Sequence, residues 1–261
     1  MTDSVVLLDV DGAVATITLN RPASRNAISG ELLTRLGEAM ATAEADDEVR
    51  AVILTGTDPA FCAGVDLKEI GQQASVLRGA ASGGTGPWAP VSKPVIAAVN
   101  GAAVTGGLEL VLNCDIVICS ERAVFADTHA RVGVLPGWGL SVLLPLAVGR
   151  SRARQMSFTG DFLPAAQALT AGLVSEVVRH DNLLGRAREI GGAIAGNDAP
   201  AVRALLASYR QVEAEVVAGG FAAEEQAARA WGRSGLDLEE TGRRRAAVTE
   251  RGRSQAARRE P

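Results

Sequence analysis

Residues 93–140 read KPVIAAVNGAAVTGGLELVLNCDIVICSERAVFADTHARVGVLPGWGL, and the rest of the chain is best interpreted around them. Residues 94–99 form a short run of β-branched residues and alanine, which predicts a buried strand, and Asn100-Gly101 follows as a turn signal. The glycine pair Gly106-Gly107 then opens an apolar segment, residues 108–112, that predicts a helix buried on most sides. The first N–H groups of such a helix have no partner within it, so they can stabilise negative charge on a ligand oxygen.

Glu109 is the one charged residue of that apolar helix. Burying an ionised carboxylate costs several kcal/mol unless the group has a partner, so this position is a candidate for catalysis. The alternative is a carboxylate that reaches the surface or caps its own helix. The spacing alone leaves both interpretations open.

A set of motifs in one order resembles the crotonase superfamily, the enoyl-CoA hydratases and isomerases. Around Glu109 the matching segments are KPVIAAVNG (93–101), GGLE (106–109), NCD (113–115) and GVLPGWG (133–139). Upstream they are NRP (20–22) and FCAGVDLK (61–68), and the likeness covers most of residues 5–180. The resemblance implies an α/β fold built as a crotonase-type spiral of ββα repeats over residues 1–196. It also implies a C-terminal helical region, residues 197–261, that packs subunits into a homotrimer or a dimer of trimers.

The order of local signals along the chain agrees with an α/β architecture. A β-hairpin is predicted for residues 5–9 and 14–19, with Asp11-Gly12 between its strands, and Ser29 is the expected N-cap of an amphipathic helix. Further strands are predicted at residues 49–54, 94–99 and 116–124, and helices beyond Gly196. Residues 71–92 are rich in Gly, Ala and Ser, and we leave open whether they form a lid, with Trp88 covering an apolar ligand, or a simple connection.

The composition is typical of a globular chain: 47% of the 261 residues are hydrophobic and 21% are charged. A net charge of −4 gives no overall field for nucleic acid or an anionic membrane. The arginines of residues 242–261 are interpreted as a solvated helix and tail, or as groups that approach the phosphates of an anionic ligand. Cys62, Cys114 and Cys119 have no metal-binding spacing, and we expect neither a disulfide framework nor a metal site. Without a basic leader or a long apolar run, the expected location is the cytoplasm, away from membranes.

The resemblance also implies which residues meet a CoA thioester. The thioester oxygen would lie between the backbone N–H groups of Val65 and Gly106, where an enolate needs donors fixed in advance. Ala63, Asp66 and Leu67 are expected to lie near the adenine end of CoA. The other expected substrate contacts are Gly107, Pro136, Gly137 and Trp138. Coenzyme A is then part of the substrate, and no separate cofactor is expected.

Hydration needs one group that activates water and one that delivers a proton to the α-carbon. In the hydratases that this chain resembles, the first is a glutamate that matches Glu109, and the second is a glutamate whose position is taken here by His129. His129 could transfer the proton itself, since imidazole titrates near neutral pH. Asp127 could contribute from the same face if both residues lie on one strand. Otherwise hydration is slow or absent. The sequence therefore predicts an enoyl-CoA hydratase, with an enoyl-CoA isomerase, a lyase or an acyl-CoA binding protein as alternatives.

Overall fold

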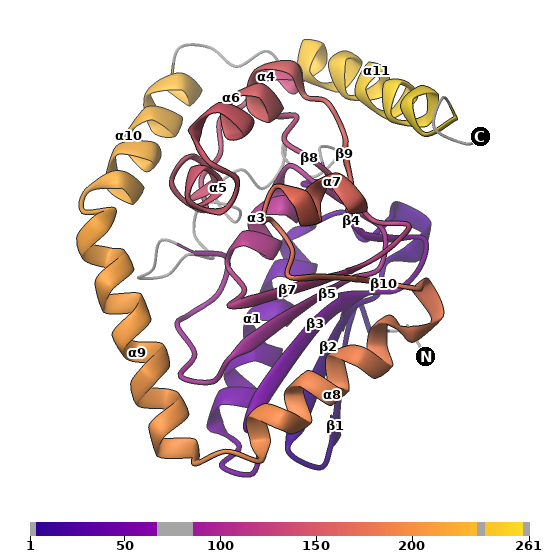
Figure 1. Cartoon of the computed structure of the whole chain (residues 1–261). Helices are drawn as coiled ribbons and strands as arrows, with labels where there is room; N and C mark the ends of the chain where they lie inside the picture. The colour runs from indigo at the N-terminus through magenta and orange to yellow at the C-terminus, as the bar shows by residue number, and fades with distance from the viewer. Residues whose placement is uncertain (1–3, 67–85, 234–237, 258–261) are drawn as a thin grey trace.

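The computed structural model describes residues 4–66, 86–233 and 238–257 (Figure 1). The strands are β1 (Val6–Asp11), β2 (Val14–Leu19), β3 (Ala51–Gly56), β4 (Ala60–Cys62), β5 (Val95–Val99), β6 (Ala102–Val104), β7 (Ile116–Ser120), β8 (Val124–Ala126), β9 (Leu163–Pro164) and β10 (Glu176–Val178). The helices are η1 (Pro22–Ser24), α1 (Gly30–Ala45), α3 (Gly106–Leu112), α4 (His129–Val132), α5 (Leu140–Val148), α6 (Arg150–Thr159), α7 (Ala165–Thr170), η2 (His180–Asn182), α8 (Leu183–Ala195), α9 (Ala199–Val216), α10 (Gly220–Arg233) and α11 (Leu238–Ala257).

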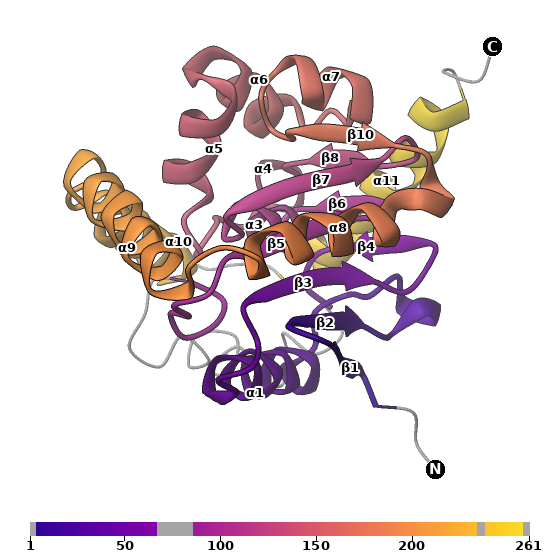
Figure 2. The same cartoon turned by 60° about the horizontal axis from the view of Figure 1, so that its bottom comes forward.

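The larger sheet has the strand order β1-β2-β3-β5-β7-β10 and is parallel except for the β1–β2 hairpin. Its central strands are buried on both faces, because α8 covers one face and the main core the other (Figure 2). On β5, for example, Val95, Ala97 and Val99 belong to the main core, whereas Ile96 and Ala98 pack in the cluster that includes α8. Alternate residues of a strand point to opposite faces, so a run that is apolar at every position fits this doubly covered sheet.

The chain alternates between the two sheets, and this gives the expected spiral of ββα repeats. β5 lies in the larger sheet, β6 in the smaller one, and α3 follows; β7, β8 and α4 repeat the pattern. The smaller sheet has the order β4-β6-β8-β9, with β4, β6 and β8 parallel. The strand signal predicted around residues 116–124 is therefore divided between two strands. Glu121 and Arg122 form an exposed turn between β7 and β8, where the chain passes to the other sheet.

The N-terminal third confirms the local predictions. The hairpin forms, and the Ser29 hydroxyl accepts a hydrogen bond from the N–H of Leu32 at 3.0 Å, capping α1. At the other end of α1, the buried ammonium group of Lys93 donates to the carbonyl oxygens of Ala43, Glu44 and Asp46 at 2.5–2.9 Å. Burial lowers the pKa of Lys93, and these three acceptors satisfy all of its donors.

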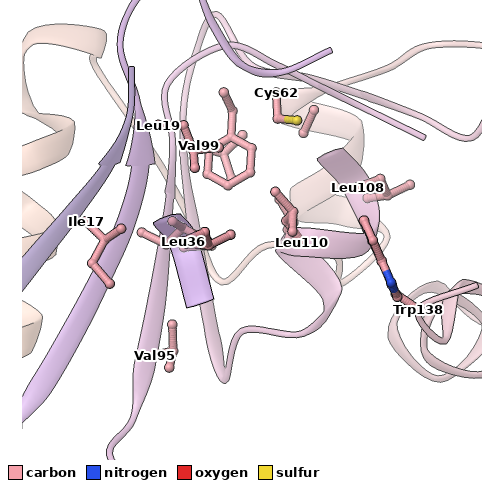
Figure 3. Close-up of a cluster of buried hydrophobic side chains, with 14 of the residues drawn as sticks. Ile17, Leu19, Leu36, Cys62, Val95, Val99, Leu108, Leu110 and Trp138 are labelled. Atoms are coloured by element: carbon pink, nitrogen blue, oxygen red, sulfur yellow. The ribbon is translucent and has the colours of Figure 1, made fainter. Parts of the chain in front are cut away.

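The core lies between the larger sheet, α1 and the smaller sheet, and Figure 3 shows part of it. Leu108 and Leu110 bring α3 into this core, and Trp138 lies beside Leu108 at its margin. Trp88, from the segment predicted as a lid or a connection, is also buried here, while residues 67–85 lie outside the described part of the chain. The core thus reaches the helix that carries Glu109.

The C-terminal helices confirm the helical prediction beyond Gly196, and α8 ends next to the expected boundary at residue 196. α9 runs along one side of the molecule, α10 lies beside α5, and α11 lies beside α4 (Figure 1). In the described residues, every helix is too short or too polar to span a bilayer. The last two helices therefore return to the spiral, close to the turn between α4 and α5.

Candidate active site

The candidate site lies where the parallel strands of the smaller sheet end. β4 leads into Ala63 and Val65, β6 leads into Thr105 and α3, and β8 leads into Asp127. The carboxyl ends of adjacent parallel strands meet at one edge of a sheet, which is a common place for ligand sites. Segments that are more than 60 residues apart in the sequence are brought together at this edge.

Glu109 is buried in α3, with 3% of its surface exposed, and its carboxylate has partners on both oxygens. Oε1 accepts hydrogen bonds from the N–H groups of Gly137 at 3.1 Å and Trp138 at 2.7 Å. Oε2 lies 3.5 Å from Nε2 of His129. The carboxylate is therefore neither at the surface nor a cap of its own helix, and these partners offset the cost of burying it.

His129 lies between two carboxylates. Its Nδ1 is 2.7 Å from Oδ1 of Asp127, and its Nε2 faces Glu109. Burial opposes a charge on the ring, but the hydrogen bonds with Asp127 and Glu109 outweigh it and raise the pKa of His129 to about 10. Burial alone would raise the pKa of Asp127, but hydrogen bonds from His129 and Ser157 outweigh it and lower the pKa. His129 is thus an imidazolium at neutral pH, with an N–H directed at each carboxylate.

The expected strand geometry of Asp127 and His129 is wrong. β8 ends at Ala126, and His129 is the first residue of α4, so the two side chains do not share the face of a strand. Asp127 instead folds back and accepts a second hydrogen bond, from the backbone N–H of His129, at 3.1 Å. It therefore faces His129 rather than occupying the position of a second reacting group.

The two backbone donors predicted from the family resemblance lie close together. Ile28 donates to the carbonyl of Gly64 and accepts from the N–H of Asp66, both at 2.8 Å, so the N–H of Val65 points away from Ile28. Gly106 is the first residue of α3, where the N–H has no partner within the helix. A Cβ atom on Gly106 would lie 3.3 Å from Cγ2 of Val65.

Close packing explains the glycine next to this donor. A Cβ atom on Gly107 would lie 2.2 Å from the carbonyl oxygen of Cys62 at the end of β4. Only a residue without a side chain lets α3 approach β4 this closely. Gly107 therefore sets the distance between the two segments that carry Val65 and Gly106.

Thr105 has a strained backbone immediately before Gly106. Its φ of 56° and ψ of −113° are rare for a β-branched residue. The conformation is held by its N–H, which donates to Ala126 at 2.8 Å, and by its hydroxyl, 2.5 Å from that of Thr128. Because ψ of Thr105 orients the next peptide, this strain sets the direction of the Gly106 N–H. The sequence analysis missed both threonines, and nothing in the local pattern marks them.

The other predicted contact residues differ in their surroundings. Asp66 is nearly buried, and its Oδ2 lies 3.3 Å from Nη2 of Arg21, so its carboxylate supports the loop after β4. Ala63 is half-buried in the same loop, and Leu67 lies outside the described residues. Trp138 packs against the core, and its Cζ3 would lie 3.6 Å from a Cβ atom on Gly106. Trp138 thus combines packing with a place beside the donor. Pro136 is buried and Gly137 is exposed.

In the basic C-terminal segment, the arginines that the structure describes form ion pairs. Arg243 and Arg244 pair with Glu240, and Arg251 pairs with Asp161. These contacts agree with a solvated helix, the first of the two interpretations. They provide no argument for a nucleic-acid interface.

Comparisons with known proteins show the family to which the chain belongs. The family model described as enoyl-CoA hydratase/isomerase matches residues 9–242. A probable enoyl-CoA hydratase of Rhizobium meliloti is 39% identical over 223 residues, which cover 84% of this chain and 86% of that protein. The crystal structure of an enoyl-CoA hydratase from Mycobacterium tuberculosis is 55% identical, with a TM-score of 0.82 over 88% of this chain and all of the other. A monofunctional enoyl-CoA isomerase from M. smegmatis is 35% identical, with a TM-score of 0.68 over 80% of this chain and 94% of the other. With this fold, these motifs and a match over most of its length, the chain belongs to the enoyl-CoA hydratase/isomerase family.

Proposed function

We propose that the protein is an enoyl-CoA hydratase that adds water to a 2-enoyl-CoA thioester. The observation that carries the proposal is the buried array of Glu109, His129 and Asp127 beside the paired N–H groups of Val65 and Gly106. Relatives named as enoyl-CoA hydratases support it.

In this proposal, the thioester oxygen binds between the N–H groups of Val65 and Gly106. Addition of water to the β-carbon moves negative charge onto that oxygen, giving an enolate. Donors that are already oriented stabilise this charge more than they stabilise the neutral thioester, which lowers the barrier. The strained Thr105 and the close contact at Gly107 keep one of these donors in place.

Glu109 and His129 divide the proton transfers. Glu109 takes a proton from water as the hydroxyl oxygen bonds to the β-carbon. His129 is already protonated, so it cannot act as the base; it donates the Nε2 proton to the α-carbon of the enolate. The proton on Glu109 then returns to His129 across the 3.5 Å contact, and both residues regain their starting states. Asp127 keeps the ring charged and oriented through Nδ1.

The second candidate is an enoyl-CoA isomerase. Moving a double bond from the 3- to the 2-position needs one base that removes a proton from the α-carbon and returns it to the γ-carbon. Glu109 alone suffices for this, and His129 in place of a second glutamate favours a site with one reacting carboxylate. The 35% identity to an enoyl-CoA isomerase supports this candidate.

The assays separate these activities from simple binding. Crotonyl-CoA is the hydratase substrate, and loss of absorbance from its conjugated thioester measures turnover; a 3-enoyl-CoA gains the same absorbance if it is isomerised. Glu109→Gln should lower kcat by a factor on the order of 10² or more, as expected for loss of a general base. Calorimetry with acetyl-CoA should show that binding survives. Glu176→Gln, at a surface ion pair with Arg186, is the control.

Each negative result has a distinct meaning. Turnover only of the 3-enoyl substrate would replace the hydratase by the isomerase. Binding without turnover of either substrate would make the protein an acyl-CoA binder. Absence of binding would overturn the assignment to CoA thioesters.

We also propose that the protein forms a homotrimer or a dimer of trimers in the cytoplasm. Leu205, Tyr209, Val212 and Val216 form an exposed apolar stripe on α9 at helical spacing. Such a face is stabilised when a symmetric assembly covers it. The three free cysteines support a reducing compartment.

A further inference from the structure

A third buried carboxylate, Glu224, lies next to the candidate active site. It belongs to α10 and has 7% of its surface exposed. It is the only buried residue of that helix, in which hydrophobic residues would be expected to dock. Charged residues are rarely buried without a specific set of partners.

The partners of Glu224 are backbone groups at the start of α5. Its Oε1 accepts from the N–H of Gly139 at 2.6 Å, and its Oε2 accepts from the N–H of Ser141 at 2.5 Å. Gly139 is the N-cap residue of α5 and has no side chain with which to cap it. A carboxylate at a helix N-terminus forms charge-assisted hydrogen bonds and opposes the positive end of the helix dipole. Glu224 is therefore the cap of α5, supplied from more than 80 residues away.

Two carboxylates divide the N–H groups of one short turn. The N–H groups of Gly137 and Trp138 donate to Glu109, and those of Gly139 and Ser141 donate to Glu224. Nδ2 of Asn113 also holds the turn by donating to the carbonyl of Trp138 at 2.9 Å, whereas Gly137 is exposed and Gly139 has a φ of 88°. Displacement of its second half would move the two donors that hold Oε1 of Glu109.

Other contacts of the C-terminal helices fix both ends of this region. Phe221, one turn before Glu224, packs so close to Gly139 that a Cβ atom there would lie 2.3 Å from the ring. At the other end, Nε1 of Trp231 donates to the carbonyl of Gly133 at 2.8 Å. α10 thus contacts the turn before and after the residues that bind Glu109.

We propose that Glu224 is a positioning residue for the reaction: by capping α5 it fixes the Gly137–Trp138 peptides and so directs Oε2 of Glu109 toward His129. The inference rests on the proposed function for its effect on turnover, but the geometry can be tested without turnover. It assigns α10 a role within its own subunit, in addition to any role in assembly.

Glu224→Gln is the decisive variant. The amide has the same shape but presents an NH₂ group to one of the two N–H donors, so one hydrogen bond is lost. The matched control is Glu225→Gln on the same helix, which affects only an exposed contact with Arg229. Site-resolved amide hydrogen exchange measures the N–H groups of Gly137 and Trp138. In Glu224→Gln we expect the amides of Gly137 and Trp138 to exchange faster than in the wild type. In the control their exchange rates should be unchanged.

Kinetics supply the second readout. Misplacing a catalytic group by a fraction of an ångström costs on the order of 10-fold in rate, so kcat should fall by about that factor with KM nearly unchanged. In a Glu109→Gln background the same change should lower kcat by less than about 2-fold, because the residue that Glu224 positions is already lost. A purely structural role would lower kcat equally in both backgrounds.

The outcomes are distinguishable. Unchanged exchange at Gly137 and Trp138 in folded Glu224→Gln overturns the proposal, and so does an equal loss of kcat in both backgrounds. If the wild type does not hydrate enoyl-CoA, the proposed function fails while the exchange data still test the geometry. If Glu224→Gln does not fold, Ser141→Pro removes one donor without touching the carboxylate, and the same exchange results decide.

Discussion

Asp127→Asn tests the idea that the charge on His129 is set by its neighbour. The substitution keeps an oxygen that can accept from Nδ1, 2.7 Å away, and it removes the negative charge. An opposite charge at such a distance raises the pKa of a histidine by roughly 1–3 units, which corresponds to about 1.4–4 kcal/mol. The pKa of His129, about 10 in the wild type, should therefore fall to between about 7 and about 9, with Glu109 still supporting the charge.

The chain has only two histidines, so NMR of the imidazole rings can follow both without ambiguity. His180 provides the matched control, because its Nε2 lies 3.0 Å from Oδ2 of Asp58, outside the site. Asp58→Asn, which changes the neighbour of His180, should leave the titration of His129 unchanged, whereas Asp127→Asn should shift it.

The pH dependence of kcat/KM should change in the same direction. If the imidazolium donates the proton, the rate falls as the ring loses its charge, so the alkaline limb of the wild type lies near pH 10. In Asp127→Asn this limb should move toward lower pH by roughly 1–3 units. An unchanged NMR titration of His129 would refute the electrostatic argument. A shifted titration with an unshifted rate profile would refute His129 as the proton donor.

Stability should follow the same groups. The pKa of His129 is raised by folding, so its stabilising effect is complete below its unfolded value of 6.5 and is lost as the pH rises through about 10. The pKa of Asp127 is lowered by folding, so its contribution is present above its unfolded value of 3.8 and is lost as the pH falls through the folded value. The pair therefore stabilises the fold between the folded pKa of Asp127 and that of His129. Asp127→Asn should weaken the fall of the free energy of unfolding toward acid pH, measured by urea unfolding.

Three further predictions concern the scaffold. Lys93→Met should lower the free energy of unfolding by about 1–3 kcal/mol, measured with urea, because three carbonyl groups lose their donor. Gly107→Ala should destabilise the fold by roughly 1–3 kcal/mol or more, since the new methyl group would clash with the carbonyl of Cys62. The control is Gly37→Ala, where the space is open, and it should be neutral or stabilising by up to about 1 kcal/mol. Equal effects of the two substitutions would contradict the packing argument. Val212→Glu on α9 should shift light scattering from trimer toward monomer, and a wild type that is already monomeric would refute the predicted assembly.

Short-range signals in the sequence were sufficient for most elements of the fold. The Ser29 cap, the hairpin and the strand at residues 95–99 depend on neighbours within a few positions, and all three were predicted. The segment 116–124 was not resolved into two strands, because both parts are rich in strand-forming residues. The polar pair Glu121-Arg122 was the one local signal of the break, and a pattern of apolar residues does not reveal that the chain changes sheets there.

The candidate site was predictable as a set of positions and not as an arrangement. Glu109 was identified because an ionised carboxylate in an apolar helix needs a partner that offsets the cost of burial. The sequence did not indicate its donors, which are the N–H groups of Gly137 and Trp138, 28 and 29 residues later. His129 was identified only because it occupies the position of a glutamate in the family pattern. That Asp127 turns back to the ring of His129 depends on where β8 ends, which spacing does not specify within a residue or two.

Glu224 shows why the function of the C-terminal helices could not be inferred from the sequence. Helix docking is normally recognised from an apolar stripe, and for residues 197–261 the family resemblance implied packing between subunits. In the structure the buried group of α10 is a carboxylate, and its partners are backbone N–H groups, which every residue except proline has. A contact between a charge and the backbone therefore leaves no complementary side chain to find in the sequence. Because this contact caps the helix that follows the turn holding Glu109, the candidate active site depends on α10 as well as on the residues before 197.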